Sequence, residues 1–561
     1  MISLLGYEWK EIKYNKRLTE KIKQDYQLSS LVSKIVINRK FNSEEIYSIK
    51  HNVDVLNPFL KDTDFLNAKT LILEFIKNKK KILIIGDYDV DGSVSTALLI
   101  NFFNRINHPC DFYIPDRVDD GYGISEKLFK KIKNKLTDLI IIVDSGSKSY
   151  KPIDYLNSLN INTIIIDHHE ISKPFPKSTI LINPKKKNNI STLHNLCASA
   201  LVYFLIDMIS KNFKNKISLN ENLLLAALGT ICDVMNLRDL NRNIIIKALS
   251  EFNPKDNFFI KNLLEIFNKK NKLTVDDFGY LIGPILNSGG RLHNSNLATK
   301  VLISNNKEEI KKISNKLISL NEKRKKIENN IIKEIDFDNE ELRNNEIILL
   351  KKTNIPEGLI GIIAARLVDR FNKPSIVITQ SNSVLKGSAR SIPEINIGTI
   401  INNAVSKNYL LSGGGHSMAA GFILKKNEYG NFEKFINKQK FKLTNKLQKE
   451  YVSKISSSAI NIDFIDDFNK LKPFGNANSH PKFLIERLKI FKPKIINNFH
   501  IQCLLKDDKN KFHDSFAFNA RNTKLSEYLL NYKKEIAIIC QLRLHYKNNN
   551  KINILIDDII T

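Results

Sequence analysis

The stretch KILIIGDYDVDG, residues 81–92, is an apolar run that ends in three closely spaced aspartates. Two further stretches repeat this arrangement, LIIIVDSG at residues 139–146 and TIIIDHHE at residues 163–170. Short runs rich in β-branched residues are typical of strands buried on both faces of a parallel sheet. Since open parallel sheets bind ligands at the carboxyl ends of their strands, the sequence predicts an α/β fold with these acids and histidines at one sheet edge.

The clustered carboxylates and imidazoles predict a divalent-metal site. Asp87, Asp89 and Asp91 would repel one another strongly unless cations or protons neutralise them. Oxygen and imidazole ligands suit Mn²⁺ or Mg²⁺ better than a thiolate-bound metal, and two ions about 3.5–4 Å apart would activate a water for in-line displacement. We therefore expect a phosphoryl-transfer enzyme. The structural alternatives are a solvated acidic turn, a helix cap at Asp144 and a surface histidine pair at 168–169.

Another candidate ligand lies outside these three stretches. Residues 223–233 read LLLAALGTICD, a buried-helix pattern that ends in Asp233. Because an unpaired charge at the end of an apolar helix is costly, we expect metal ligation there, with a helix cap or an ion pair as the alternative.

The charge of the chain favours a polyanionic partner. Its 87 Lys and Arg residues against 59 Asp and Glu residues give a net charge of +28, which favours salt-sensitive binding to nucleic acid. The crowding of lysine, asparagine and isoleucine, as in an AT-rich genome, is a compositional alternative. Five cysteines without CxxC spacing argue against a disulfide framework or a zinc site. Apolar runs are too short for a membrane span and the start does not resemble a signal peptide, so we expect a cytoplasmic protein.

At 561 residues the chain is too long for one hydrophobic core. Alternating strand and helix signals predict a catalytic α/β domain, followed by a long solvated helix and a second α/β domain. The C-terminal alternation favours a small barrel of the oligonucleotide-binding (OB) type. The expected divisions are a helical lead-in at 1–75, the catalytic domain at 76–304, the connecting helix at 305–342, the second domain at 343–445 and the barrel at 455–561.

Taken together, these motifs resemble the DHH phosphoesterase superfamily, named for the triplet at 167–169. Over roughly residues 50–561 the chain is similar to the bacterial single-strand-specific 5′-to-3′ DNA exonucleases of that superfamily. The resemblance implies a parallel-sheet DHH domain, a DHH-associated domain and an OB-like barrel. Beyond the motifs above, it is carried by IPDR (114–117), GYG (121–123), CDV (232–234), NSGGRL (287–292), LNEKR (320–324), GLIG (358–361), KGSARS (386–391), GGGHSMAAG (413–421) and LKPFGNAN (471–478).

The resemblance also implies a role for individual residues. Arg291 would hold the scissile phosphate, which agrees with the bidentate phosphate contacts that arginine makes. Surface ion pairs for the arginines and a domain-interface histidine at 416 are the alternatives. The implied metal ligands are Asp87, Asp89, Asp91, Asp144, His168 and Asp233, and the implied catalytic residues are Asp144, His168, His169 and Arg291. A pocket for the 5′-terminal phosphate is implied at Arg117, Ser388 and Arg390, with His416 in the cleft.

The resemblance implies an enzyme that releases 5′-mononucleotides from single-stranded DNA in repair and recombination. The resemblance also implies two Mn²⁺ or Mg²⁺ ions as cofactors. It further implies a monomer without a membrane association that works alongside a helicase and a single-strand-binding protein. One position departs from the family pattern, because Ile355-Pro356 stands where the family commonly shows Trp-His. The alternatives are a DHH oligoribonuclease or cyclic-dinucleotide phosphodiesterase, and an inactive strand-binding scaffold.

Overall fold

The computed structural model describes the whole chain except residues 1, 118, 122, 188–190, 214–218, 256, 270–271, 293, 336–343, 442–447, 498, 533, 546–547 and 561. The chain forms two compact units. Unit 1 comprises Met1–Asp54, Asn236–Ile246 and Leu443–Thr561, and unit 2 comprises Val55–Met235 and Lys247–Lys442. Among the described residues, no helix is both long and apolar enough to cross a membrane.

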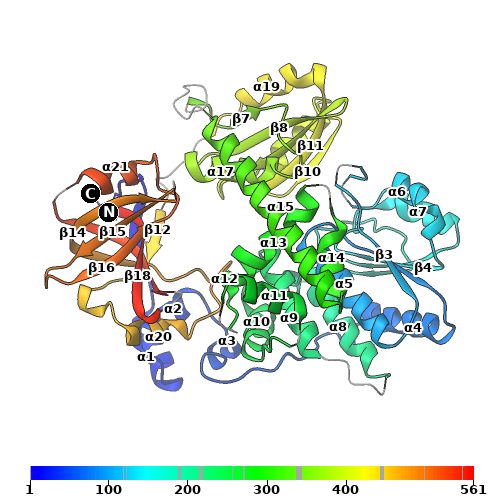
Figure 1. The fold of residues 1–561 in the computed structure, drawn as a ribbon, viewed down its shortest axis with the longest axis horizontal. Helices are drawn as coiled ribbons and strands as arrows, with labels where there is room; N and C mark the ends of the chain where they lie inside the picture. The colour runs from blue at the N-terminus through cyan, green and yellow to red at the C-terminus, as the bar shows by residue number, and fades with distance from the viewer. Residues whose placement is uncertain are drawn as a thin grey trace. The chain divides into compact units, whose positions relative to one another are not determined.

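Unit 2 contains the parallel sheet that the three apolar stretches predict (Figure 1). Its strands run in the order β3-β2-β4-β5-β6, and every neighbouring pair is parallel. Strands β2 and β4 bury all their residues, which explains why their sequences carry no polar side chain. The strands are β2 (Ile82–Ile85), β3 (Cys110–Tyr113), β4 (Leu139–Val143), β5 (Asn162–Ile166) and β6 (Ile180–Ile182).

Helices surround this sheet and build the body of the catalytic domain. The central helix α5 follows β2 directly and packs against α8, α9 and α14. Its residues are almost all buried, as the apolar sequence after the first aspartate cluster requires. The helices are α4 (Thr63–Lys77), α5 (Val90–Arg105), α6 (Glu126–Lys131), α7 (Tyr150–Ser158), α8 (Ala198–Ser210), α9 (Leu219–Cys232), α11 (Phe258–Ile266), α12 (Val275–Asp277), α13 (Gly283–Arg291) and α14 (Asn296–Ile303). Most of α10 (Asp239–Ser250) belongs to unit 1.

The second α/β domain follows the long helix α15 (Lys307–Lys333), whose start is capped by the Asn306 side chain. The predicted connecting helix extended to 342, but residues 336–343 lie outside the described part of the chain. The sheet of this domain has the order β10-β11-β9-β8-β7, with β7 and β8 parallel and the other pairs antiparallel. Its elements are β7 (Ile348–Lys351), α17 (Ile360–Phe371), β8 (Ser375–Ser381), β9 (Val384–Arg390), α18 (Ile397–Ser406), β10 (Ser412–Gly415), β11 (Ala419–Lys425) and α19 (Tyr429–Asn437).

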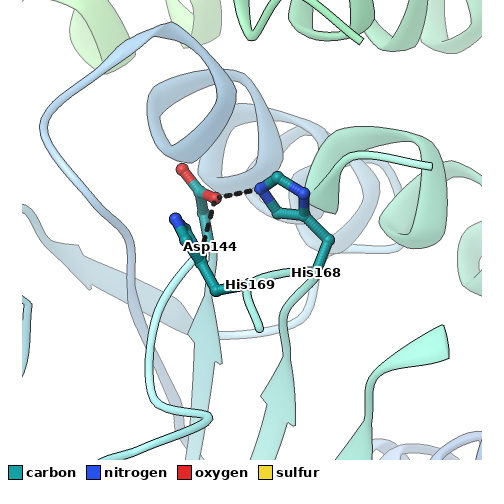
Figure 2. Close-up of side chains that lie close together, drawn as sticks. All are labelled: Asp144, His168 and His169. Carbon is teal, nitrogen blue, oxygen red and sulfur yellow. Dashed lines mark ion pairs between the residues drawn. The ribbon is translucent and has the colours of Figure 1, made fainter. Parts of the chain in front are cut away.

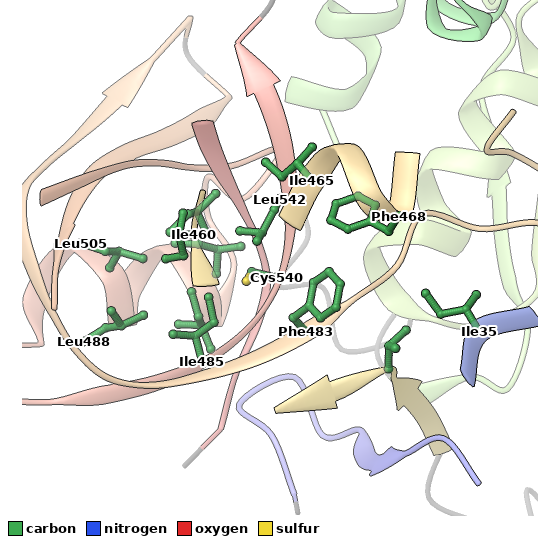
Figure 3. Close-up of a cluster of buried hydrophobic side chains, with 14 of the residues drawn as sticks. Ile35, Ile460, Ile465, Phe468, Phe483, Ile485, Leu488, Leu505, Cys540 and Leu542 are labelled. Carbon is green, nitrogen blue, oxygen red and sulfur yellow. The ribbon is translucent and has the colours of Figure 1, made fainter. Parts of the chain in front are cut away.

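Unit 1 contains the predicted barrel. Each strand is hydrogen-bonded to its neighbour in the spatial order β14-β15-β16-β18-β17. Strand β17 also pairs with β14, so the five strands form a closed barrel. Figure 3 shows the apolar interior, to which β15 contributes every second residue. The elements are β12 (Gln448–Tyr451), β13 (Ser453–Lys454), α20 (Ile462–Asn469), β14 (Phe483–Ile496), β15 (His500–Lys506), β16 (Phe512–Ala517), α21 (Lys524–Asn531), β17 (Ile536–His545) and β18 (Asn548–Ile560).

The N-terminal segment belongs to the barrel unit rather than standing apart as a lead-in. Strand β1 (Glu8–Glu11) pairs in parallel with β12, and Ile35 of α2 lies in the same apolar cluster as Phe483 (Figure 3). The helices of this segment are α1 (Lys16–Asp25), α2 (Ser30–Asn38) and α3 (Ser43–Tyr47). The α/β class and the barrel are therefore as predicted, whereas the five domain boundaries stay a prediction.

Candidate metal centre

Three aspartates lie at the junction between β2 and α5. Asp87 is buried directly after the strand, Asp89 caps α5 by accepting a hydrogen bond from the Gly92 amide at 3.1 Å, and Asp91 is buried in the first helical turn. A Cβ atom at Gly92 would lie 2.6 Å from the Asp87 backbone, so only glycine fits there. One tight turn thus presents three carboxylates at the sheet edge where parallel sheets bind ligands.

Asp144 and the two histidines come from the ends of β4 and β5. Figure 2 shows Asp144 between both imidazoles, with its Oδ1 atom 3.3 Å from His168 Nε2 and 4.0 Å from His169 Nδ1. The Asp144 backbone has φ 59°, a left-handed conformation that aspartate tolerates better than most residues. The sheet therefore brings the second and third sequence motifs into contact.

His168 also lies close to two further carboxylates. Its Nε2 atom is 3.3 Å from Asp233 Oδ2 and 4.0 Å from Asp91 Oδ2. The buried Asp233 Oδ2 atom accepts no hydrogen bond from any described residue, despite its closeness to the imidazole. Burial lowers the pKa of His168 and so favours the neutral imidazole, which is the form that ligates metals.

Two interactions that sequence reasoning missed orient these ligands. The Asp91 carboxylate accepts hydrogen bonds from the Ala198 and Ser199 amides, at 2.8 and 3.0 Å, at the start of α8. A Cβ atom at Gly229 would lie 2.6 Å from Asp91 Oδ1, so α9 approaches closely only because that residue is glycine. Since both partners lie more than a hundred residues away, no local pattern signals them.

The second missed interaction is made by Asp167, the first residue of the DHH triplet. Asp167 Oδ1 lies 2.7 Å from His169 Nδ1, and the carboxylate also accepts from the Ser147 amide at 3.0 Å. Burial opposes ionisation, but these bonds outweigh it and hold the pKa of Asp167 well below its usual range. Burial likewise opposes a charged His169, but the bond to Asp167 raises the pKa of His169 to about 9.

Three of the other acids, Asp87, Asp144 and Asp233, have raised pKa values instead. Burial, reinforced by the charge of Asp89, raises the pKa of Asp87 to about 7. Burial and neighbouring aspartates also raise the pKa values of Asp144 and Asp233 well above their usual range. These carboxyl groups resist ionisation because they are buried close together. Bound cations would offset the repulsion between the ionised carboxylates.

The geometry of these side chains suits more than one ion. Ligand atoms within 4.8 Å of one another occur in three groups, which overlap at Asp144 and His168. All the donors are oxygens or imidazole nitrogens, the set preferred by Mn²⁺ and Mg²⁺ rather than by thiolate-bound metals. The groups are Asp87, Asp89 and Asp144; Asp91, His168 and Asp233; and Asp144, His168 and His169.

Arg291 lies at the end of α13, where the second domain meets the catalytic domain within unit 2. Its Nη1 atom donates a hydrogen bond to the Gly358 carbonyl oxygen at 3.1 Å. A Cβ atom at Gly358 would lie 2.3 Å from the Arg291 carbonyl oxygen, so the loop can approach only with glycine there. Burial and repulsion from Arg117 lower the pKa of Arg291 to about 10.

Of the three residues predicted to bind a terminal phosphate, Ser388 and Arg390 are in contact. Arg390 Nη1 donates to Ser388 Oγ at 3.0 Å, and a Cβ atom at Gly361 would lie 2.8 Å from Arg390 Nη2. Burial and repulsion from Arg117 lower the pKa of Arg390, so the two guanidinium groups lie within electrostatic range of each other. Arg117 itself lies over the Tyr88 ring, 5.3 Å from its centroid.

His416 is placed more loosely than the other predicted residues. It is an exposed residue that follows β10, and its amide donates to the Ala419 carbonyl oxygen at 2.8 Å. It lies within electrostatic range of Glu170, Lys148 and His169. His416 thus lies near the residues that follow the DHH triplet, but among the described residues it belongs to none of the groups that could hold a metal ion.

The domains of the chain match three known families. Residues 81–230 match the DHH family N-terminal domain, residues 344–441 match the DHHA1 domain, and residues 453–558 match the RecJ OB domain. The order of these matches follows the order of the parallel sheet, the second α/β domain and the barrel. All the predicted metal ligands except Asp233 lie inside the first match.

Similar proteins cover nearly the whole chain. Single-stranded-DNA-specific exonuclease RecJ of Bacillus subtilis is 28% identical over 96% of this chain and 68% of its own length. The proteins of the same name from Haemophilus influenzae and Escherichia coli are 26% and 25% identical, covering 93% and 95% of this chain and 95% and 96% of their own. The crystal structure of Thermus thermophilus RecJ with Mn²⁺ covers 99% of this chain and 80% of its own, with a TM-score of 0.82 and 19% identity, a likeness of fold.

Proposed function

The chain belongs to the RecJ family of DHH phosphoesterases, and on that premise we propose that it is a single-stranded-DNA-specific 5′-to-3′ exonuclease. The observation that carries this proposal is the overlap of three ligand groups at Asp144 and His168. Such overlap provides adjacent positions for two divalent ions, as in-line phosphodiester hydrolysis requires. The 5′-mononucleotide is the proposed product, released during DNA repair and recombination.

The side chains at the centre fit two Mn²⁺ or Mg²⁺ ions. Asp87, Asp89 and Asp144 would hold one, while Asp91, His168 and Asp233 would hold the other. The Asp233 Oδ2 atom accepts no hydrogen bond from a described residue and is therefore open to a metal ion. A bound cation would also offset the repulsion from Asp91 and Asp89 that, after burial, raises the pKa of Asp233. When bound, the ions supply an activated water and neutralise charge on the attacking and leaving oxygens.

Two positively charged groups of the chain would act on the phosphate itself. Because Asp167 raises the pKa of His169 to about 9, this imidazole is charged at neutral pH and can offset charge that develops on the phosphate. The Arg291 guanidinium is held by its hydrogen bond to the Gly358 carbonyl oxygen, and most of the Arg291 side chain is buried. It would therefore lose little conformational entropy when it binds the phosphate. We assign these two residues to the scissile phosphodiester.

The proposed polarity rests on Arg117, Ser388 and Arg390. Burial and the nearby charge of Arg117 lower the pKa of Arg390, and a doubly charged anion such as a 5′-terminal phosphate would offset that repulsion. A strand held there by its end would present its first phosphodiester to the acids. His416 would contact the strand from the second domain.

The barrel would provide a further binding surface for the single strand. Its outer face exposes Phe491 and Phe512, and the Lys506 ammonium lies 5.7 and 5.8 Å from these two ring centroids. Interleaved aromatic and basic side chains are the means by which OB barrels bind single strands. We further propose a monomeric cytoplasmic enzyme that works with a helicase and a single-strand-binding protein.

The experiment that tests this function is hydrolysis of 5′-phosphorylated single-stranded DNA, a matched duplex and a dinucleotide. Each substrate is incubated with Mn²⁺, Mg²⁺ or chelator, and the products are resolved by size from either labelled end. We expect metal-dependent release of mononucleotides from the 5′ end of the single strand alone. A preference for the dinucleotide would identify a small-substrate phosphodiesterase instead, and binding without cleavage under either metal would identify a scaffold.

A further inference from the structure

One continuous helical segment, formed by α12, a π-helical turn (Phe278–Ile282) and α13, presents a stripe of accessible residues. In α13 only Pro284, Asn287 and Arg291 are not buried, and Tyr280 is exposed in the turn before it. Positions 280, 284, 287 and 291 are four, three and four residues apart, which is the repeat of one helix face. The first interval crosses the π turn, whose wider coil returns residue i+4 to about the same side. We call these four positions the accessible face.

Both ends of this segment pack against the motifs that form the metal centre. A Cβ atom at Gly283 would lie 2.5 Å from Cys232 Sγ, so the π turn lies directly beside the residue that precedes Asp233. A Cβ atom at Gly290 would lie 2.6 Å from the Tyr88 carbonyl oxygen, between the first two aspartates of the cluster. All these residues belong to unit 2. The accessible face therefore borders the metal centre within one compact unit.

Tyr280 is placed for contact with a ligand rather than for packing. Among the described residues, no large apolar side chain is more exposed than Tyr280, at 79%. Its ring therefore contributes little to the core of unit 2. It also lies in a π turn, a rare geometry inside α-helices that is frequent at functional sites. An exposed aromatic ring can stack on any base of a single strand.

We propose that Tyr280 stacks on a base of the single strand, on the 3′ side of the phosphodiester that is hydrolysed. The opposite end of the accessible face is Arg291, which is assigned to that phosphodiester. After the larger effect of burial, the charge of Arg117 in the proposed 5′-phosphate pocket lowers the pKa of Arg291, so the pocket lies near this end of the face. This inference rests on the proposed function.

The length of the segment sets which base the ring would meet. Tyr280 lies eleven residues before Arg291, and a helical rise of 1.5 Å per residue separates them by about 16 Å along the axis. Because the 5′ end is held near Arg291, the strand reaches Tyr280 only after several nucleotides. The stacked base is therefore behind the nucleotide that is released, and stacking suits an enzyme that must accept every sequence.

The test measures the affinity of the full chain for a 5′-phosphorylated single strand in chelator, by the fluorescence anisotropy of a 3′ label. Tyr280→Ala should weaken binding at least about fivefold, the lower end of what one stacked base contributes. Tyr280→Phe keeps the ring and should bind as the wild type does. Tyr150→Ala, which removes a tyrosine with 37% exposure at the start of α7 in the same unit, should also leave the affinity unchanged.

A scan with one abasic position moved along the strand identifies the stacked base. At one position, several nucleotides from the 5′ end, the wild type and Tyr280→Ala should bind equally, because neither can stack there. Unchanged affinity in Tyr280→Ala, a loss that persists at every abasic position, or an equal loss in Tyr280→Phe would overturn the proposal. Failure of the wild-type protein to release mononucleotides from the 5′ end would instead refute the proposed function, so the two failures are distinguishable.

Discussion

Replacement of Asp87 by asparagine should make the chelator-treated protein more stable while it destroys activity. Asp87 is 2% exposed, and burial together with Asp89 raises its pKa from 3.8 to about 7. Each pH unit corresponds to about 1.4 kcal/mol, so ionisation of this one group in the folded chain costs about 4 kcal/mol. Asparagine removes that cost, and its side-chain oxygen can still accept the 2.8 Å hydrogen bond from the Tyr88 amide.

The sign of the effect fixes its dependence on pH. The pKa of Asp87 is higher in the folded chain than in the unfolded chain, so wild-type stability falls as pH rises from about 4 to about 7. The advantage of Asp87→Asn is therefore absent below about pH 4 and complete above about pH 7. Added Mn²⁺ should reverse the order, because ligand binding stabilises the folded state and the variant has lost a ligand.

Differential scanning calorimetry in chelator, from pH 5 to 8.5, measures this difference. Fluorescence would miss it, since the one tryptophan of the chain, Trp9, lies in unit 1 and Asp87 in unit 2. Asp111→Asn on β3 of the same sheet is the matched control, because this exposed residue pairs with Lys81 on the surface and should change stability little at any pH. A variant less stable than wild type at pH 8 in chelator, or an advantage that does not vary with pH, would refute the reasoning.

Three further outcomes follow from the site and the barrel. Asp89→Ala or His168→Ala should abolish turnover with single-strand affinity largely retained in filter binding, and normal turnover in either would contradict the assignment of the ligands. Arg390→Ala should reduce the preference for a 5′-phosphate over a 5′-hydroxyl end at least tenfold, since a charged hydrogen bond contributes about 1.5–3 kcal/mol; an unchanged preference would place the terminal phosphate elsewhere. Phe491→Ala should weaken single-strand binding by about 1–3 kcal/mol through loss of base stacking, whereas Phe258→Ala, with 38% exposure against 37%, should not; equal effects would argue against a barrel track.

The strand-end acids could be predicted because their signal is local. A run of buried branched residues defines a parallel strand, the sheet rule places its carboxyl end, and an acid or histidine within the next two residues is then a candidate ligand. Asp87, Asp144 and His168 follow from that reasoning alone. Asp233 required a different signal, a charge at the end of an apolar helix, and the structure places it 3.3 Å from His168.

What the sequence could not reveal depends on pairs far apart along the chain. Nothing in Glu8–Glu11 indicates a parallel partner at Gln448–Tyr451, so the sequence alone predicts only a helical lead-in for the N-terminal segment. The amides of Ala198 and Ser199 that orient Asp91 are equally hidden, because an amide donor has no side-chain signature. Local patterns predict which residues could react, while distant backbone contacts decide how they are held.

The departure at Ile355-Pro356 shows how such backbone contacts bear on function. Ile355 is 3% exposed within an apolar cluster, and Thr379 Oγ1 donates to its carbonyl oxygen at 2.7 Å, so this residue serves packing in this chain. Three residues later, Gly358 receives the Arg291 guanidinium through its carbonyl oxygen and admits the Arg291 backbone through its missing side chain. Because both contacts are made by main-chain atoms, the loop can position Arg291 without an aromatic ring or an imidazole at 355–356. The Trp-His pair of the family pattern is therefore absent from the loop, while the contact that holds Arg291, the arginine proposed to bind the phosphate, is present.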